Sequence, residues 1–543
     1  MTKEEKVDRR TWLKVTGGTV AGLAIGGAIG YFAKPTEMAP PTTVTRTATE
    51  TVTITGTAPP PKDIVLERAV KGIQDLIAAG KVPKGTVINF ADEAGMQENA
   101  VRVAGGEFYK HTPFTRDDFD IQVIGIPYEG LYDKFISEAM TKTGAYDVLY
   151  SVTSNTTPDM VEVGVLRPIE DYLAKYDPDG QMRNSFVGKA WNYQAMCKGR
   201  IYGLPGDADV LLLNYRKDII GHPEEKDNFK ARYGYELRPP VTWKEYYDVA
   251  EFFTRKAGDK AAGQTLDKDM YGHLEWRLKF LSEQWYWMKL ATVYDDPSRT
   301  YIDPDTLEPT INSPEAVEVL EYMGSLNKFM EPGWQTHGFG DHSPLFNDGR
   351  AVMWVMVTSG PKLSQQPDIS KVVGKVGCTV HPYWNRERYY LLAGSGSTCG
   401  ISNYSKNQEL AWLANQAIHS PTLNWYVWGI WETNMTVCVK NLMEDPRIRA
   451  GQWADFTMDP ILTNNMLDAV YKSAVSGFPE FVVPGYRTFM EFLTTNTQKY
   501  YNGDVSAQKA MDDTAKSWAE TIDRIGKDKI RKYYSELVKQ MPP

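Results

Sequence analysis

Two aspartates, Asp207 and Asp209, stand one residue apart in "IYGLPGDADVLLLNYRKD" (residues 201–218), between two runs typical of β-strands. A turn needs only one aspartate, whereas a catalytic carboxylate pair, a metal site or the floor of a sugar-binding cleft could each use both. Residues i and i+2 of a strand face the same side, so both carboxylates can reach one ligand. Carboxylates accept strong, charge-assisted hydrogen bonds from neighbouring sugar hydroxyls. A separation of about 7 Å would also suit the carboxyl pair of a glycoside hydrolase.

Other residues that could do chemistry show no recognised spacing. The four cysteines form no C-x-x-C pair and the seven histidines no H-x-x-x-H pair, which argues against zinc or iron–sulfur ligation. Cys378 and Cys399 flank neighbouring apolar runs, and in an exported protein we expect them to form a disulfide. No G-x-S-x-G, H-E-x-x-H, P-loop or G-x-G-x-x-G motif is present. We therefore expect a protein that is not an enzyme and that holds no metal or cofactor.

Length and composition limit the class of protein. A chain of 543 residues is too long for one compact core, which favours two lobes. The net charge of -9 argues against a nucleic-acid partner, because binding to phosphates needs a basic face. The 15 Trp and 31 Tyr residues are typical either of large cores or of stacking surfaces for the apolar faces of sugar rings.

The N-terminal region is typical of an exported protein. "RRTWLK" (9–14) precedes an uncharged segment, 15–33, and this pattern resembles a twin-arginine export signal. As a helix that segment would span about 28 Å, close to the hydrocarbon thickness of a bilayer. No A-x-A cleavage pattern or lipidation cysteine is evident, so we expect residues 1–35 to be a retained membrane anchor rather than a removed signal. Residues 36–61 are rich in Thr and Pro and predict an extended stalk, with glycosylation left open.

Strands and helices alternate from residue 86 onward. "TVINFADEA", "FDIQVIGI" and "YDVLYSVTSN" are typical of strands, with helical patterns at 96–108 and 128–144 between them. This order predicts an α/β fold with a mostly parallel sheet, in which ligands bind beyond the carboxyl ends of the strands. Those ends carry Asp92, Glu93 and the polar run 151–155.

Three later helices have recognisable starts. Thr242 and Glu245 have the spacing of a capping box, and so do Ser405 and Gln408. Ser313 followed by Pro314 is typical of an N-cap and a first helical position.

Several stretches, taken in order, resemble the extracellular solute-binding proteins of sugar ABC transporters, the group that includes maltose-binding protein. They are "YDVLY" with "VEVGVLRPIEDYL", "KGRIYGLPGDADVLLLNYRKDII", "PPVTWKEYYDVAEFFT", "LFNDGRAVMWVM", "CGISNYSKNQELAWLANQAI" and "NGDVSAQKAMDDTAKSW". The resemblance covers roughly residues 85–526. Similar Thr-rich stalks occur on surface-anchored archaeal binding proteins.

The resemblance implies an α/β fold of the periplasmic-binding-protein type II-like class. Two discontinuous lobes would be joined by hinge strands, with a cleft between them. We expect residues 62–208 and 351–420 in the first lobe, and 209–350 and 421–543 in the second. The chain would cross at "GLPGDADVLLLNY" and return at "AVMWVM".

The resemblance also implies a set of ligand-binding residues. The family's binding carboxylate aligns best with Asp209. Trp285 and Trp287 match a region that supplies aromatic platforms, and their helical spacing turns only one of them toward the cleft; Trp354 is equally compatible with core and cleft. The full set is Glu93, Ser151, Ser154, Asn155, Asp207, Asp209, Trp285, Trp287, Trp354, Ser395, Gly396 and Tyr486.

The function implied is that of the extracytoplasmic binding component of an ABC importer. It would bind a carbohydrate, most simply an oligosaccharide, and deliver it to membrane permease subunits. It would work at the extracellular face of the cell membrane, tethered through its N-terminal segment or secreted. The alternatives are a secreted glycoside hydrolase that uses Asp207 and Asp209, and a binding protein for peptides or another solute.

Overall fold

The computed structural model describes residues 63–207, 209–278, 282–391, 396–431, 433 and 436–542. The expected anchor (1–35), the stalk (36–61) and Ser395 lie outside the described residues. Within the described ranges, no helix combines the length and the apolar composition that a membrane crossing requires.

A five-stranded sheet organises the first half of the fold, which we call lobe 1. Its strand order is β2-β1-β3-β14-β6. β1 lies parallel to β2 and β3, whereas β14 runs antiparallel to β3 and β6. The strands are β1 (Thr86–Glu93), β2 (Phe119–Ile126), β3 (Val148–Thr153), β6 (Gly203–Asp207) and β14 (Ser397–Ile401). The alternation expected from the sequence is therefore confirmed.

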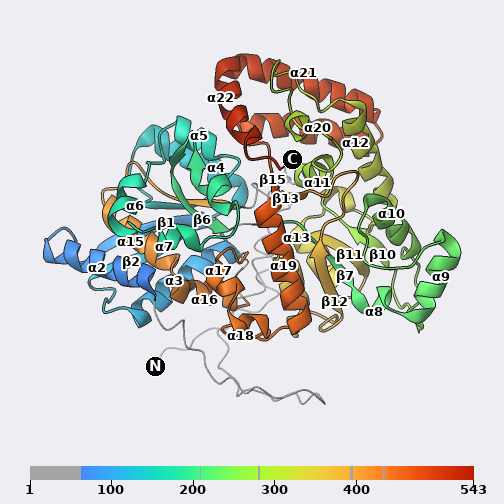
Figure 1. Cartoon of the computed structure of the whole chain (residues 1–543), viewed down its shortest axis with the longest axis horizontal. Coiled ribbons are helices and arrows are strands. Elements are labelled where there is room, and N and C mark those ends of the chain that lie inside the picture. The colour runs from blue at the N-terminus through green and yellow to red at the C-terminus, as the bar shows by residue number, and fades with distance from the viewer. Residues whose placement is uncertain are drawn as a thin grey trace, which may run out of the picture. The chain divides into compact units, whose positions relative to one another are not determined.

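Helices cover lobe 1 (Figure 1). α3 packs on β1 and β2, and α4 packs on β1 and β3; α15 packs against α2, and α16 against α3. These and the smaller elements are α2 (Ile64–Ala78), α3 (Met96–His111), α4 (Tyr128–Thr141), α5 (Thr157–Glu162), α6 (Glu170–Tyr176), α7 (Gln181–Ser185), η1 (Trp191–Ala195), β4 (Met196–Cys197), β5 (Arg200–Ile201), α15 (Gln408–Ile418) and α16 (Pro421–Gly429).

A four-stranded sheet organises the second half, lobe 2. Its order is β10-β11-β7-β12, with β7 antiparallel to both of its neighbours. The strands are β7 (Leu212–Arg216), β10 (Tyr271–Leu274), β11 (Ala351–Met356) and β12 (Val376–Val380). α10 packs on β10, α13 on β11, α14 on β11 and β12, and α19 on β12.

The helices and short strands of lobe 2 and of the C-terminal part are α8 (Lys217–Ile220), α9 (Pro223–Tyr233), α10 (Trp243–Phe252), β8 (Lys260–Ala261), β9 (Gln264–Thr265), α11 (Ser282–Leu290), η2 (Pro297–Arg299), α12 (Pro314–Leu326), η3 (Asn327–Phe329), η4 (Trp334–Thr336), α13 (Phe339–Asn347), α14 (Ser359–Ser364), β13 (Tyr389–Leu391), α17 (Lys440–Met443), α18 (Pro446–Arg449), α19 (Pro460–Ser476), β15 (Gly477–Pro479), α20 (Tyr486–Tyr501), α21 (Ala507–Ile525) and α22 (Lys527–Val538). α21 packs on α12 and α20, and β13 pairs with β15.

Sheet pairing differs from the lobe boundaries expected from the sequence. β11 and β12 were expected in the first lobe, but they flank β7 in the sheet of lobe 2. The chain rejoins the first sheet only at β14, and α16, expected in the second lobe, packs on α3. The physical reason is that β7 is a buried strand, and both rows of its backbone hydrogen-bonding groups need partners.

The expected Cys378–Cys399 disulfide is wrong. Cys378 lies in β12 and Cys399 in β14, two different sheets, and all four cysteines are buried and outside any disulfide. Cys399 Sγ instead donates to the backbone oxygen of Tyr150, 3.2 Å away.

Two of the three expected helix starts are confirmed. Thr242 and Glu245 form a capping box, and Ser313 caps the helix that begins at Pro314. The Ser405 start is wrong, because that helix begins at Gln408 with Asn407 as its N-cap. The Ser405 hydroxyl is engaged with Asp147 and with the Asn407 amide.

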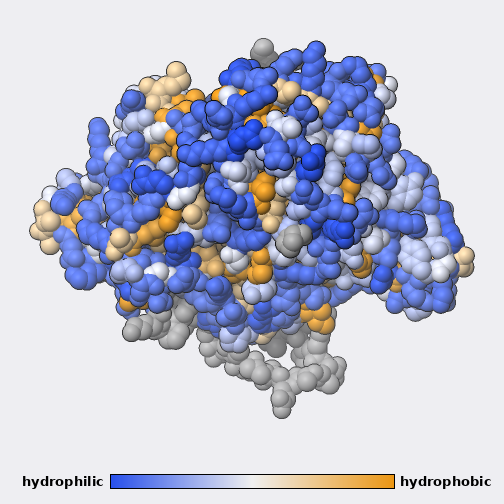
Figure 2. Space-filling model, turned by 45° about the horizontal axis from the view of Figure 1, so that its top comes forward, coloured by the Kyte–Doolittle hydropathy of each residue, from blue (hydrophilic) through white to orange (hydrophobic). Residues whose placement is uncertain are grey.

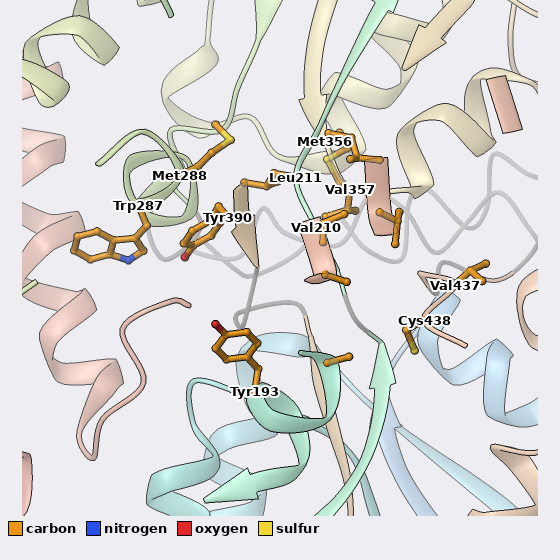
Figure 3. Close-up of a cluster of buried hydrophobic side chains, with 14 of the residues drawn as sticks. Tyr193, Val210, Leu211, Trp287, Met288, Met356, Val357, Tyr390, Val437 and Cys438 are labelled. Atoms are coloured by element: carbon orange, nitrogen blue, oxygen red, sulfur yellow. The ribbon is translucent and has the colours of Figure 1, made fainter. Parts of the chain in front are cut away.

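The crossing between the lobes is an apolar core. Val210 and Leu211 lie on the segment between β6 and β7, and Figure 3 shows them beside Met356 and Val357 from the end of β11. All four side chains are buried. By contrast, the face of the molecule in Figure 2 is mostly hydrophilic, with apolar residues in small separate patches.

Candidate functional site

Asp207 and Asp209 converge on one residue, Thr436. Asp207 Oδ1 accepts from the backbone N of Thr436 at 2.7 Å, and its Oδ2 accepts from Gln97 Nε2 at 3.0 Å. Asp209 accepts from the hydroxyl of the same threonine. Both aspartates are almost fully buried, at 0% and 2% exposed. The two carboxylates therefore lie together at the point where the chain leaves the first sheet.

Gly206 allows this placement. A Cβ on Gly206 would lie 2.3 Å from Cys399 Sγ and 2.6 Å from Ser397 Oγ, closer than real side chains approach. Because Gly206 has no side chain, β6 can pair closely with β14. The strand then ends at Asp207 and delivers its carboxylate to the boundary between the lobes.

Burial has the largest effect on the pKa values of the carboxyl groups at this site. It raises the pKa of Asp207 to about 7, although the hydrogen bonds from Thr436 and Gln97 act in the opposite direction. Burial, followed by the charge of Asp207, holds the pKa of Asp209 well above its usual range. Glu93, at the end of β1, has its pKa raised to about 8 by burial and then by the charges of Asp92 and Asp207. Carboxyl groups in this state can be protonated near neutral pH, when each can donate as well as accept a hydrogen bond.

Residues of other elements form a second buried polar group. Glu480, just after β15, accepts from Asn155 Nδ2 at 3.3 Å and from the hydroxyl of Tyr486. Glu283, on α11, is 4% exposed, and burial followed by the charge of Glu480 raises its pKa to about 8.

Tyr128 connects the two groups electrostatically. Burial raises its pKa first, and the charges of Glu93, Glu283 and Glu480 raise it further. The charges of acidic side chains from lobe 1 and from the C-terminal half of the chain therefore all act on one tyrosine.

Ser154 and Gly396 contact each other directly. The carbonyl of Gly396 accepts from both the backbone N of Ser154, at 3.0 Å, and its Oγ, at 3.1 Å. Ser154 also lines a groove of about 330 Å³, whose opposite wall includes Val482, Tyr533 and Leu537. Ser151 lies within β3.

The three tryptophans expected near the ligand lie in the core of lobe 2. Trp285 is 1% exposed, and its Nε1 donates to the carbonyl of Val355. Trp287 is enclosed by Tyr301 and Trp518, with ring centroids 4.9 and 6.0 Å away (Figure 3 shows it at the edge of the apolar cluster). Trp354 packs on Phe346 at 5.4 Å. None of these rings offers an open face in this conformation, because each residue is at most 1% exposed.

The structure adds residues that sequence reasoning missed. Thr436 and Gln97 bind the two aspartates, while Glu283, Glu480 and Tyr128 complete the acidic surroundings. The run "GFPEFVVP" carried the one usable signal, a single acid among apolar residues at Glu480. Nothing in the sequence around Thr436 distinguishes it from an ordinary loop threonine.

Taken together, the arrangement suits recognition of a neutral, hydroxyl-rich molecule. It offers carboxyl groups, an amide at Asn155 and a phenol at Tyr486 at a boundary between two lobes. Bidentate acceptors of this kind match neighbouring hydroxyl groups.

Comparisons with known proteins agree with this description. A family model described as bacterial extracellular solute-binding protein matches residues 89–415, more than half of the chain.

Solved structures share the fold at low sequence identity. A solute-binding protein of an ABC transporter from Agrobacterium radiobacter K84, in complex with ribitol, is 20% identical with a TM-score of 0.64, covering 81% of this chain and 99% of that one. Maltose-bound MalE3 from T. maritima is 18% identical with a TM-score of 0.62, covering 80% and 100%. A solute-binding protein from Thermotoga lettingae TMO with bound alpha-D-tagatose is 18% identical with a TM-score of 0.59, covering 81% and 99%.

Proposed function

Because the chain belongs to the family of bacterial extracellular solute-binding proteins, we propose that it binds a carbohydrate between its lobes and delivers it to the permease subunits of an ABC importer. The observation that supports this proposal is that polar side chains from distant parts of the chain pair at the end of the first sheet: Asp207 and Asp209 share Thr436, and Asn155, just after β3, donates to Glu480. The relatives of known structure contain ribitol, maltose or tagatose, all of which are rich in hydroxyl groups.

Binding would work by a shift in population. Each lobe supplies only part of the polar surface, so a ligand gains all of its contacts only when the lobes are closed around it. Asp207, Asp209 and Asn155 would hold hydroxyl groups from the side of lobe 1, and Glu480 and Tyr486 from the other side of the cleft. Glu93, Ser154 and Gly396 complete the set that we propose, and the buried tryptophans serve the core.

No bond is broken in this proposal. We propose that the carboxyl pair binds rather than catalyses, because the family and the similar solved structures are binding proteins. The closed form is the one that the permease would recognise.

Family membership implies a location outside the cytoplasm. We propose that residues 1–35 act as a twin-arginine signal retained as an anchor, and that the Thr/Pro-rich segment 36–61 holds the two lobes away from the membrane.

A ligand screen on the full-length chain tests the proposal. Sugars, sugar alcohols and short peptides would be compared by thermal unfolding in detergent. A ligand at about 100 times its dissociation constant adds about 2.7 kcal/mol of stability. We expect a carbohydrate to stabilise the protein and peptides not to do so. Stabilisation by peptides alone, or release of reducing sugar from an oligosaccharide, would contradict the proposal.

A substitution then locates the site. Asp209→Ala removes a hydrogen-bonding group worth about 1.5–3 kcal/mol, so the affinity for the sugar should fall about tenfold to a hundredfold. Asp75→Ala changes a carboxylate on the exposed face of α2 and should leave the affinity unchanged. Isothermal titration of both variants with the same sugar gives the comparison, and equal affinities would remove Asp209 from the site.

A further inference from the structure

Three potential metal ligands gather on lobe 2, apart from the polar groups at the lobe boundary. Glu331 Oε1 lies 2.5 Å from His337 Nδ1 and 2.9 Å from His342 Nε2. One potential ligand atom from each of the three residues lies within 4.8 Å of the other two. Carboxylate oxygen and imidazole nitrogen are ligands that first-row transition metals accept together.

Short local elements bring these side chains together. Glu331 precedes a turn at Gly333, where φ is 91°, and η4 follows directly. A Cβ on Gly333 would lie 2.9 Å from His337 Nε2, so glycine makes room for that ring. His342 lies at the start of α13, whose first turn is closed by Asp341 accepting from the Gly338 backbone N. The geometry is therefore set by a glycine turn and a capped helix rather than by a loose loop.

The carboxylate is buried and keeps acceptor capacity. Glu331 is 4% exposed and His342 is 0% exposed. Glu331 Oε2 has no hydrogen-bond partner among the described residues, although its Oε1 serves both histidines. A buried carboxylate oxygen without a partner is costly, and a cation beside it would remove that cost.

We propose that Glu331, His337 and His342 bind a divalent transition-metal ion of the Zn²⁺ class. Bonds of about 2.0–2.2 Å in tetrahedral geometry place ligand atoms about 3.3–3.6 Å apart, so Glu331 Oε1 would have to move about 0.4–1.1 Å away from the two histidine nitrogens. The side chain of His337 is 24% exposed, which leaves an approach from solvent and a place for a water as fourth ligand.

The competing explanation is a purely structural one, in which two histidine N–H groups donate to one carboxylate. A metal instead takes the lone pairs of those same nitrogens, so each proton there must move to the other ring nitrogen or leave, and metal binding cannot coexist with the two hydrogen bonds. The two explanations therefore differ in a measurable way.

The test uses the full-length chain without a histidine tag, freed of metal with a chelator. We expect one Zn²⁺ per chain, at micromolar affinity or tighter, in competition with a chromogenic chelator. Co²⁺ should give visible absorption bands from the bound ion. Two variants test the ligands: Glu331→Gln keeps hydrogen-bonding capacity, and His337→Gln replaces a partly exposed ring, so at least the second variant should fold. Each substitution should weaken Zn²⁺ binding by about tenfold or more and abolish the Co²⁺ absorption bands.

His111→Gln is the matched control, because His111 pairs with a single carboxylate, Glu107, at 3.5 Å. It should leave Zn²⁺ binding unchanged. Failure of the wild-type chain to bind Zn²⁺ stoichiometrically, or equal binding by the wild type and His337→Gln, would overturn the proposal. Circular dichroism without metal confirms that each variant is folded before the comparison.

Discussion

Burial raises the pKa of the Asp207 carboxyl group and hydrogen bonding lowers it, and the effect of burial is the larger. The pKa rises to about 7, whereas an unfolded aspartate titrates near 4. Between these values the folded chain holds a proton that the unfolded chain has lost. The contribution of Asp207 to stability is therefore fully present below about pH 4 and is lost as the pH rises through about 7.

Asp207→Asn should flatten this pH dependence. The asparagine has nothing to ionise, and its oxygen can still accept from Thr436 N. Gln97 Oε1 is buried without a partner among the described residues. If the side-chain amide of Gln97 rotates by about 180°, this oxygen can accept from the new asparagine amide. Urea unfolding from pH 5 to pH 8 should show a slope shallower by up to about 1.4 kcal/mol per pH unit than that of the wild type.

Asp75→Asn, on the exposed face of α2, is the control and should keep the wild-type slope. Glu93 and Glu283, with pKa values raised to about 8, maintain part of the slope in every variant. Identical slopes for Asp207→Asn and the wild type would show that Asp207 is not protonated in the folded protein.

Glu480 offers a second prediction at the scale of one residue. It is 0% exposed and accepts from Asn155 and Tyr486. Glu480→Ala leaves both donors buried without this acceptor, which should lower the free energy of unfolding by about 1–3 kcal/mol. Glu480→Gln keeps one acceptor oxygen and should cost less. Urea unfolding at one pH ranks the two variants, and equal losses would mean that hydrogen bonding at Glu480 does not stabilise the fold.

At the scale of elements, the contact between β6 and β14 depends on Gly206. A Cβ there meets Cys399 and Ser397 at less than 3 Å, so Gly206→Ala must push the strands apart. We expect a loss of about 1–3 kcal/mol in stability, because overpacking of a filled core costs that much. Differential scanning calorimetry should show a lower unfolding temperature.

Gly106 is the matched control, since it lies within α3 and a Cβ added there would meet no neighbouring atom within 4 Å. Alanine favours the helix over glycine by about 0.8–1.0 kcal/mol, so Gly106→Ala should raise the unfolding temperature. If both variants shifted the temperature in the same direction, the close approach of β6 and β14 would not be the cause.

At the scale of the whole chain, hydrogen bonds join lobe 1 to the C-terminal helix. Glu162, at the end of α5, accepts from Lys529 at 3.0 Å and from the Tyr533 hydroxyl at 2.8 Å, and both donors lie on α22. Asp159 of α5 also accepts from Gly485 N at 2.8 Å. Of these residues, Tyr533 also lines the groove that Ser154 lines.

Glu162→Gln should favour the open state. Partly exposed pairs of this kind contribute about 0–1 kcal/mol, so ligand affinity should fall about twofold to fivefold. Small-angle scattering should show a larger radius of gyration for the unliganded variant, and saturating ligand should restore the compact value.

Glu409→Gln is a close match, because Glu409 accepts from Lys175 at 2.6 Å and Tyr176 at 2.8 Å, all within lobe 1. Glu409→Gln should change neither the ligand affinity nor the radius of gyration. An equal effect of both substitutions would attribute the change to general loss of stability rather than to opening of the lobes.

The sequence by itself determined the local structure and the class of fold. The first three strands appear at the expected places, because alternation of apolar runs and helical periods is a property of adjacent residues. The fold class followed from short motifs in a fixed order, and Asp207 and Asp209 were identifiable because two acids between apolar strands are unusual.

Only the tertiary structure decided which distant residues meet. Thr436 reaches Asp207 across 229 positions of the chain, and Asn155 reaches Glu480 across 325. Trp287 has the residue type of a sugar platform, but its neighbours enclose it, and burial is set by packing rather than by residue type. The pairing of β11 with β7 likewise joins strands that lie far apart in the chain. Sequence spacing carries no record of these contacts, because the chain brings such residues together only when its apolar surfaces are buried.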